Sequence, residues 1–421
     1  MMSRLLCRFL VIGSLLAASS ASQAFLNQGR LPPFAGAEDT TFFGSNGRDA
    51  AVSDHGFDAT VRAIVYHPGS NSLIVGGDFT KYNGVFVNGL AKISLDGQLD
   101  TTFNANIGAG FTGSVYTIAV DNNNRIVVGG TFVNAGGYSN LDYIARLQPD
   151  GSYDSFFQPD AIAGEIKSIA IDGSNRIVIG CNCHDDVPLP YNYQLLARLR
   201  ASDGKFDSTF AQTALTYDGS ASVNSVALTS DGSIVAGGSF VISGTKNNVM
   251  KFQTNGNVDN SFLVNIGTAT TASSFVYAVR VQADDKILVG GTFTTFDGFA
   301  APKLVRLQAN GIRDTGFALS SQLGTVYGIF LDSAAKLLVV GTQFGNVGSN
   351  PGYQQIRRYG TAGGATDLSL NPGAGFGPLA SNIVYSMAYH KGYLYAVGDF
   401  SSYNAHNVPR ITKIYVGPYD P

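Results

Sequence analysis

Seven stretches of this chain end in the same way, with a run of Val, Ile and Leu that leads into glycine and, in most copies, a Phe. They occupy residues 72–79, 125–132, 176–183, 233–240, 286–293, 336–344 and 393–400. Six steps separate Phe79 from Phe400, which gives a period of roughly 53 residues. Units of this size build solenoids or propellers, because each one buries its apolar faces only against its neighbours. The repeat therefore constrains the architecture far more tightly than the function.

The first residues have the three regions of a secretory signal peptide. Basic residues precede an apolar run from Phe9 to Ala18, and small residues stand before a cleavage point after Ala24. We therefore expect residues 1–24 to be removed and residues 25–421 to form one secreted domain, extracellular or periplasmic. No later run reaches about eighteen apolar residues, so no membrane span is expected.

Composition favours strands and turns and disfavours two classes of partner. The chain has 51 glycines and only 14% charged residues, and its Val, Ile and Tyr runs are separated by Asp-Gly or Asn-Gly. A net charge of −3 without a basic block argues against nucleic acid and anionic lipid. Cys181 and Cys183 are the only cysteines after residue 24, so the core must come from packing and not from a disulfide framework.

Residues 115–157 show how one repeat is built. An alternating segment (115–121), an Asn-rich turn, the apolar segment 125–132, a long polar loop, a third short segment and a Pro-Asp-Gly turn follow one another. This spacing predicts four short antiparallel strands. The first two are apolar on both faces, as expected where twisted sheets pack face to face around an axis. Paired glycines inside the second strand, such as Gly129 and Gly130, predict a bulge or a close neighbouring backbone.

Each repeat closes with Asp, two variable residues and Phe. The copies begin at Asp100, Asp154, Asp207, Asp259 and Asp314, with a degenerate copy from Asp367 to Leu370. Recurrence in every repeat is typical of scaffold positions and not of an active site. We therefore expect the Asp to accept hydrogen bonds from turn amides and the Phe to fill the core.

An extra copy of this ending stands at the start of the chain, at residues 39–42, whereas the last strand-three segment, residues 410–416, has none after it. The N-terminal copy can supply the missing outer strand of the last repeat. Closure of a ring removes exposed strand edges, which an open solenoid would keep. The expected fold is all-β, a seven-bladed β-propeller of four-stranded antiparallel blades closed by this strand; a linear array is the alternative.

The unit resembles the delta-60 repeat, a bacterial propeller-forming repeat. The resemblance rests on ILVGGTF in strand two, on a strand three that ends in IARLQPDG and on the Asp-x-x-Phe ending, and it covers about residues 39–415. The third repeat departs from it at Cys183, and the sixth at Leu370. The resemblance implies a secreted or surface-exposed bacterial propeller and brings neither a catalytic residue nor a cofactor.

Strands that alternate in direction place two kinds of link at opposite ends of the ring. The links from strand one to two and from three to four are tight turns, and they define a short-turn face. The links from strand two to three and from one repeat to the next are long, and they define a long-loop face, where we expect ligands to bind. Candidate contacts to a protein or glycan there are Tyr138, Tyr191, Tyr193, Tyr353, Tyr403 and His406.

The alternative for some of these aromatics is structural. Tyr82, Phe296 and Tyr403 occupy equivalent turns, so they can cap the repeat instead of meeting a ligand.

The densest group of metal-binding side chains is Cys181, Cys183, His184 and Asp185. A single Cys-x-Cys has no second pair, and Cys183 replaces a core Phe, so a buried thiol pair or a disulfide is the favoured interpretation, with metal and redox sites as alternatives. Residues 108–113 match G-x-G-x-x-G in letters but open a strand and no helix, so no nucleotide cofactor is expected.

Three functions remain open at this point. The leading hypothesis is a secreted binding or adhesion module that engages protein or glycan through the long-loop face. A hydrolase or lyase of extracellular polysaccharide, with an axial active site of carboxylates and His, is the first alternative. A structural component of a surface layer or biofilm matrix is the second.

Overall fold

The computed structural model describes the repeats and the segment near the N-terminus that packs on them. The described residues are 35–42, 55–162, 164–183, 195–211, 215–216, 221–242, 245–262, 275–296, 299–301, 303–319, 323–333, 336–344, 354–371, 373, 375–377 and 382–417. Residues 1–24, expected to be a signal peptide, lie outside this part of the chain. Within it, no helix is long and apolar enough to cross a membrane.

Seven antiparallel sheets, each with at least three strands, follow one another along the described residues. In chain order they are β1 (Val61–His67), β2 (Ser72–Gly77) and β5 (Leu90–Ser94); β6 (Val115–Val120), β7 (Ile126–Gly130) and β8 (Ile144–Leu147); β9 (Gly164–Ile171), β10 (Ile177–Cys183) and β11 (Leu196–Leu199); β13 (Ser222–Leu228), β14 (Ile234–Ile242) and β15 (Thr245–Phe252), with β12 (Leu215–Thr216) on β14; β16 (Val276–Val281), β17 (Ile287–Gly291) and β20 (Leu304–Leu307); β21 (Val326–Ser333), β22 (Lys336–Phe344) and β23 (Gln354–Gly360); and β24 (Ile383–His390), β25 (Tyr393–Asp399) and β28 (Ile411–Tyr415).

Short elements fill the longer links. Three two-stranded hairpins project from the link between strands two and three: β3 (Lys81–Tyr82) with β4 (Val85–Phe86), β18 (Thr295–Phe296) with β19 (Phe299–Ala300), and β26 (Ser402–Tyr403) with β27 (His406–Asn407). The described helices are also short: η1 (Pro68–Ser70), α2 (Thr101–Asn106) and η2 (Ala135–Gly137).

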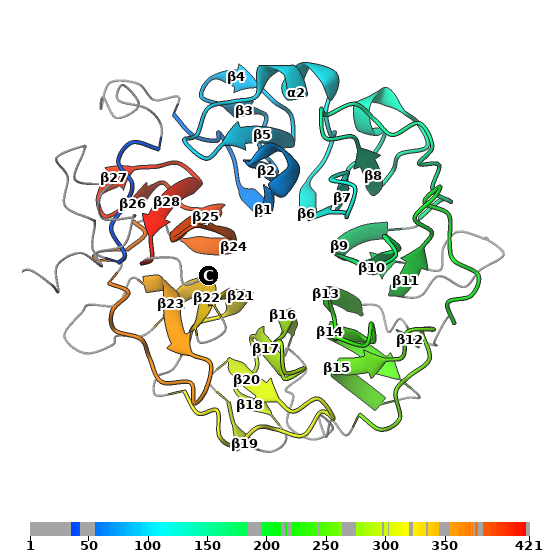
Figure 1. Ribbon diagram of the computed structural model, residues 1–421, viewed down its shortest axis with the longest axis vertical. Coiled ribbons are helices and arrows are strands. Elements are labelled where there is room, and N and C mark those ends of the chain that lie inside the picture. The colour runs from blue at the N-terminus through cyan, green and yellow to red at the C-terminus, as the bar shows by residue number, and fades with distance from the viewer. Residues whose placement is uncertain are drawn as a thin grey trace, which may run out of the picture.

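The sheets stand around a common axis with their first strands innermost (Figure 1). Going round the axis, β1 contacts β6, β6 contacts β9, β9 contacts β13, β13 contacts β16, β16 contacts β21, β21 contacts β24, and β24 contacts β1. Every inner strand is therefore packed between two others, which explains why its residues are apolar on both faces.

The paired glycines have the steric reason that their recurrence predicts. A Cβ on Gly129 would lie 2.6 Å from the Ile166 side chain of the next sheet, and a Cβ on Gly130 would lie 2.0 Å from the Ser114 carbonyl oxygen. Both approaches are closer than a methyl group permits. The equivalent glycines Gly237 and Gly238 meet the same two kinds of neighbour. Glycine at these positions thus lets adjacent sheets approach closely and admits a bulge in the inner strand.

The fourth strand of each repeat is shorter than expected. In six repeats it is a single bridge to strand three, as between Ile93 and Leu99 or between Leu147 and Tyr153. The next residue is the Asp of Asp-x-x-Phe, whose carboxylate accepts a hydrogen bond from the amide two residues on, so the chain turns at once. The fourth of the predicted short strands is therefore reduced to a single bridge, while the predicted role of the Asp is confirmed.

Residues 35–42 make the seventh copy of this bridge, on the last sheet. Glu38 pairs with Ile414, the Asp39 amide donates to the Lys413 carbonyl at 2.8 Å, and the Tyr415 amide donates to the Ala37 carbonyl at 2.8 Å. Phe42 is buried in the core that the first and last sheets share. Figure 1 shows this dark-blue segment beside the red strands β27 and β28.

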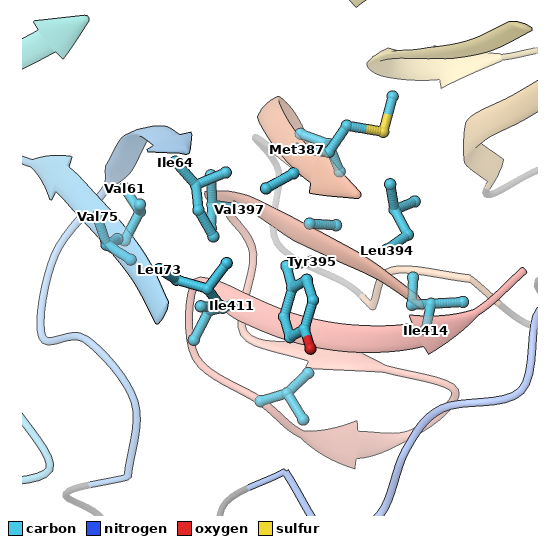
Figure 2. Close-up of a cluster of buried hydrophobic side chains, with 14 of the residues drawn as sticks. Val61, Ile64, Leu73, Val75, Met387, Leu394, Tyr395, Val397, Ile411 and Ile414 are labelled. Atoms are coloured by element: carbon cyan, nitrogen blue, oxygen red, sulfur yellow. The ribbon is translucent and has the colours of Figure 1, made fainter. Parts of the chain in front are cut away.

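The first and last sheets share one apolar core. Val61, Leu73 and Val75 from the first sheet and Leu394 and Val397 from the last all belong to the same buried cluster (Figure 2). These five side chains are fully buried. The junction between the two sheets is therefore packed like the interior of the protein.

An ion pair on strand three recurs in all seven described sheets and was not predicted from the sequence. We call this pair, together with the aromatic ring beside it, the strand-three clasp. The pairs are Lys92 with Asp100, Arg146 with Asp154, Arg198 with Asp207, Lys251 with Asp259, Arg306 with Asp314, Arg358 with Asp367, and Lys413 with Asp39.

The second repeat shows the clasp in full. Arg146 Nε donates to Asp154 Oδ2 at 2.8 Å, and the guanidinium lies 4.7 Å from the centre of the Phe157 ring. Its Nη1 and Nη2 donate to the carbonyls of Ala201 and Ser202, in the strand three-to-four turn of the next sheet, at 2.6 and 3.1 Å. Each clasp of this kind joins two neighbouring sheets at the short-turn face.

Candidate binding site

One residue at the start of each innermost strand is skipped in the pairing with the middle strand. In β1 the skip falls between Val61 and Ala63, and the same skip recurs in the other six described sheets. The skipped residues, which we call the axial ring, are Arg62, Tyr116, Lys167, Asn224, Tyr277, Tyr327 and Tyr385. Each is the extra residue of a β-bulge, which turns a side chain out of the regular alternation.

The axial ring lies at the long-loop face. Each bulge is at the beginning of the inner strand and opposite the end of the middle strand, where the long links start. The bulge recurs at the same register of every inner strand, and the inner strands surround the axis (Figure 1), so the seven residues occupy equivalent positions around it.

Aromatic rings make up one half of the axial ring. The ring centroids of Tyr277 and Tyr327 are 4.9 Å apart and stacked, those of Tyr327 and Tyr385 are 5.3 Å apart and edge to face, and Phe275 lies 6.1 Å from Tyr277. Burial raises the pKa of Tyr277 and of Tyr327, and it also raises the pKa of Tyr385 although the charge of Arg62 acts in the opposite direction. The three tyrosines therefore stay neutral phenols at physiological pH.

The remaining members are two cations, Arg62 and Lys167, with Tyr116 and Asn224. The Arg62 guanidinium lies 5.0 Å from the Tyr116 ring centre and 5.6 Å from that of Tyr385. Lys167 Nζ lies 4.3 Å from the Tyr116 ring centre. Asn224 completes the circle, since its Nδ2 donates to the Val276 carbonyl of the next inner strand at 3.0 Å.

Both cations have a carboxylate partner close by. Arg62 Nε and Nη2 each donate to Asp78 at 2.7 Å, and Lys167 forms an ion pair with Glu165. Burial alone would lower the pKa of Arg62, but the ion pair with Asp78 outweighs it and raises the pKa. The charges of the ring are thus balanced locally, and what it presents is a half-buried aromatic surface with fixed polar groups.

Such a surface can stack on sugar rings or receive aromatic and aliphatic side chains of a protein. The stacked tyrosines supply area with few rotatable bonds, and the neighbouring cations add attraction for electron-rich rings. Of the described carboxylates and histidines, no group of three or more is placed to hold a metal ion.

The predicted contact residues have different surroundings. Tyr138 is 52% exposed, at the end of η2, with its ring 5.1 Å from that of Tyr153. His406 is exposed on the β26–β27 hairpin, and its Nδ1 lies 2.7 Å from Glu38 Oε2. Both remain predictions as ligand contacts, although His406 also holds the N-terminal segment.

The prediction that Tyr403 contacts a ligand is wrong for its side chain. Tyr403 is fully buried, and its hydroxyl donates to the Gly36 carbonyl at 2.8 Å. Tyr82, at the equivalent turn, is also fully buried and donates to the Gly97 carbonyl at 2.6 Å. The structural alternative, in which these rings cap the repeat, is the one the contacts bear out.

The remaining predicted contacts, Tyr191, Tyr193 and Tyr353, lie outside the described residues, as do His184 and Asp185 of the metal alternative.

The two cysteines form a disulfide. Cys181 and Cys183 are buried on β10, and their Cα atoms are 5.4 Å apart, well inside the usual range for a bridge. A disulfide sulfur is not a thiolate, so the metal alternative fails for both cysteines.

The axial ring itself was missed at the sequence level. The signal was present, because each of its residues directly follows a buried Val or Ile at the start of strand one. A strict two-residue alternation assigns this position to a sheet face, whereas the bulge takes its side chain out of that alternation.

Four stretches of the chain, residues 70–103, 122–157, 229–262 and 282–317, match a family described as a "Domain of unknown function (DUF5122) beta-propeller". The protein is a β-propeller. Each matched stretch runs from the end of one inner strand to the Asp-x-x-Phe ending, so it contains the middle strand and the strand-three clasp of one blade.

Solved structures support the same fold. The chain is similar to the WD40 β-propeller domain of Doa1, with 12% identity, a TM-score of 0.53 and coverage of 86% of this chain and 93% of that one. It is also similar to a streptogramin B lyase, with 10% identity, a TM-score of 0.50 and coverage of 88% and 96%. At these identities the likeness shows the fold alone. No curated protein sequence matches the chain.

Proposed function

We propose that this protein is a secreted bacterial seven-bladed β-propeller, built from repeats of the delta-60 type and closed by its N-terminal segment, that binds a protein or glycan through its long-loop face. The axial ring is the contact surface. A β-propeller is in general a binding or scaffold module, and here the long links and the ring lie at the same face.

The observation that carries this proposal is the composition of the axial ring. At seven equivalent backbone positions the chain places four tyrosines, an arginine, a lysine and an asparagine. Scaffold positions in this protein keep one kind of chemistry, as the strand-three clasp keeps a cation, either Lys or Arg, opposite an Asp. Variation at a fixed backbone position, with half-buried aromatic side chains, is typical of a recognition surface.

The alternative of a polysaccharide hydrolase or lyase finds less support in this surface. Carboxylates near the ring, Asp78 and Glu165, are engaged by Arg62 and Lys167. A glycosidase general acid needs a carboxyl whose pKa is raised. The described carboxyls with a resolved shift, Asp39, Asp58, Asp100, Asp150, Asp203, Asp207, Asp231 and Asp284, all have a lowered pKa.

A glycan array and a peptide display library test the proposal directly. The wild-type protein should retain specific ligands, and the triple variant Tyr277→Ala, Tyr327→Ala, Tyr385→Ala should lose them while keeping its circular dichroism spectrum. The matched control replaces two exposed side chains elsewhere, Phe156→Ala and Leu368→Ala, and should bind like the wild type. Ligands held equally well by the triple variant would remove the axial ring from the proposal.

Closure and secretion have separate tests. Hydrogen exchange should show protected amides at Asp39 and Tyr415, which donate to carbonyls across the junction. Rapid exchange at both would argue against closure. Secretion predicts that protein recovered from outside the cytoplasm begins close to Phe25, as measured by intact mass.

A further inference from the structure

The axial ring contains two ion pairs that are open to solvent. Arg62 is paired with Asp78, and Lys167 is paired with Glu165. The four side chains are between 26% and 36% exposed, whereas the cations of the strand-three clasp are between 1% and 13% exposed. The clasp pairs are therefore part of the interior, and the two pairs of the axial ring can be reached from outside.

Contacts within the axial ring fix the position of the Arg62–Asp78 pair. The Arg62 guanidinium is flanked by the rings of Tyr116 and Tyr385, which belong to the inner strands on either side of β1. Tyr116 is also contacted by the ammonium group of Lys167. Both ion pairs are therefore continuous with the tyrosines of the ring.

The Arg62–Asp78 pair keeps hydrogen-bonding capacity on both partners. Asp78 accepts one bond from Nε and one from Nη2 of Arg62, each at 2.7 Å. These bonds leave N–H groups on the guanidinium and lone pairs on the carboxylate unused. Among the described residues, Arg62 has no further hydrogen-bond acceptor. The pair thus offers donors and acceptors side by side.

The charges of the axial ring and of its ion partners cancel. Each of the two cations has its own carboxylate, and three of the tyrosines have a raised pKa and stay neutral. A charged group brought to this surface meets a like charge about as closely as an opposite one, so it gains little net attraction. An uncharged polar ligand avoids this repulsion.

A hydroxyl is the polar group that best matches such a pair, because it can donate and accept at the same time. Hydroxyls on adjacent carbons of a sugar can accept from Arg62 and donate to Asp78, and the C–H face of the sugar can lie against tyrosine. A protein surface would instead remove the ion pairs from water, which costs desolvation, and charged residues are depleted at the centre of protein interfaces. The pairs therefore favour a glycan over a protein.

We propose, on the basis of the function proposed above, that the ligand of the axial ring is an uncharged glycan and that hydroxyls of one of its sugars bind the Arg62–Asp78 pair. The tyrosines supply the area on which the sugar packs. The ion pair supplies the hydrogen bonds that orient it and replaces the water that hydrates the free sugar.

A glycan array that holds each uncharged oligosaccharide beside its charged counterparts tests the ligand class. Gluco-oligosaccharides stand beside oligoglucuronates and oligoglucosamines, and galacto-oligosaccharides stand beside oligogalacturonates. The wild-type protein should retain uncharged members in preference to the acidic and basic ones. Its affinity for them, measured by calorimetry, should be nearly the same in about 50 and about 500 mM sodium chloride, because no charge on the ligand is screened.

Single variants test the ion pair as the contact. Arg62→Gln and Asp78→Asn should each weaken binding of the retained glycan about tenfold or more, because each removes charge-assisted hydrogen bonds to hydroxyls. The matched control is Arg280→Gln, since Arg280 is an exposed cation on the inner strand β16 that lies outside the axial ring. The control should bind the glycan like the wild type.

Preference for acidic or basic glycans, retention of peptides alone, or unchanged affinity in both ion-pair variants would overturn the uncharged glycan as the ligand. The proposed binding function would survive each of these results if the triple variant of Tyr277, Tyr327 and Tyr385 still lost the ligand. A ligand held equally well by the triple variant would remove both proposals. The preference of the wild-type protein decides the ligand class even if a variant does not fold.

Discussion

The two faces of the propeller use repetition in opposite ways. At the short-turn face, each blade repeats both the backbone and the chemistry, so a cation, an Asp and usually a Phe recur in the strand-three clasp. At the long-loop face, the bulge recurs in every described blade but the side chain on it changes. Positions that hold the blades together keep their chemistry from blade to blade. Positions whose side chain changes while the backbone does not are those where we propose that a ligand binds.

The largest expected effect comes from removing a buried cation of the clasp. Arg146→Leu leaves Asp154 buried, with only Arg125 at 3.5 Å to compensate, and it also removes two hydrogen bonds to the next blade. We expect the free energy of unfolding to fall by about 3–5 kcal/mol, measured by urea denaturation. Arg200→Ala, which removes an exposed ion pair with Asp203, is the control and should change little. Equal losses of unfolding free energy in the two variants would mean that the clasp stabilises the protein no more than an exposed ion pair does.

The next largest loss of stability is expected at one of two adjacent phenylalanines and not at the other. Phe157 fills the core beneath Gly204 of the next blade and is 1% exposed, whereas Phe156 is 78% exposed. Phe157→Ala should lower the free energy of unfolding by about 3–5 kcal/mol and Phe156→Ala by less than about 0.5 kcal/mol. The melting temperatures of the two variants measure this difference directly, and a large loss for Phe156→Ala would contradict the assignment.

A smaller effect on stability is expected at the axial ring. Tyr327→Ala removes a half-buried ring that stacks on Tyr277 and touches Tyr385, so the loss should be about 1 kcal/mol, well below that of the clasp variants. Urea denaturation alongside Phe157→Ala gives the ratio of the two losses. A loss as large as that of Phe157→Ala would make the axial ring a scaffold feature.

The smallest expected effect is a loss of stability at low pH. Burial alone would raise the pKa of Asp39, but hydrogen bonds with Thr41 and Lys413 outweigh it and hold the pKa below its ordinary value of 3.8. At Asp100 and Asp207, too, hydrogen bonds and a nearby cation outweigh burial and lower the pKa. Because the unfolded chain then binds protons more readily, this stability is present above the ordinary value and is lost as the pH falls through the lowered pKa.

Urea midpoints between neutral pH and about pH 2 measure this loss. Asp39→Asn keeps an oxygen that can accept from the Thr41 amide but cannot ionise, so its midpoint should depend less on acid than that of the wild type. A wild-type midpoint that does not move over this range would contradict the expected ionisation of the clasp.

The repeat allowed much of this architecture to be predicted. The paired glycines predicted a close approach between sheets, and the Asp-x-x-Phe ending predicted both the Asp turn and the buried Phe. The clasp cation could also have been found, because Lys or Arg recurs at one position of strand three; its contacts, however, run partly to the next blade, and these are not visible along one strand. The bulge hid the axial ring for a similar reason, since it breaks the alternation from which side-chain direction is inferred.

The wrong assignment of Tyr403 has a different cause. An aromatic residue in a long link is expected at the surface, but this link folds back as the β26–β27 hairpin and turns the ring inward, against Phe376. Tyr82 does the same in the first blade. The equivalence of Tyr403 with Tyr82 predicted its buried position correctly, whereas its place in a long link did not.

Pairing of residues 37–39 with residues 413–415 also concerns how the molecule is made. The segment near the N-terminus, which leaves the ribosome early, cannot pair until the final strand has been made. Contacts this distant in sequence form late and slowly. During that interval the last sheet exposes the strand edge and the apolar surface that residues 35–42 cover in the folded protein.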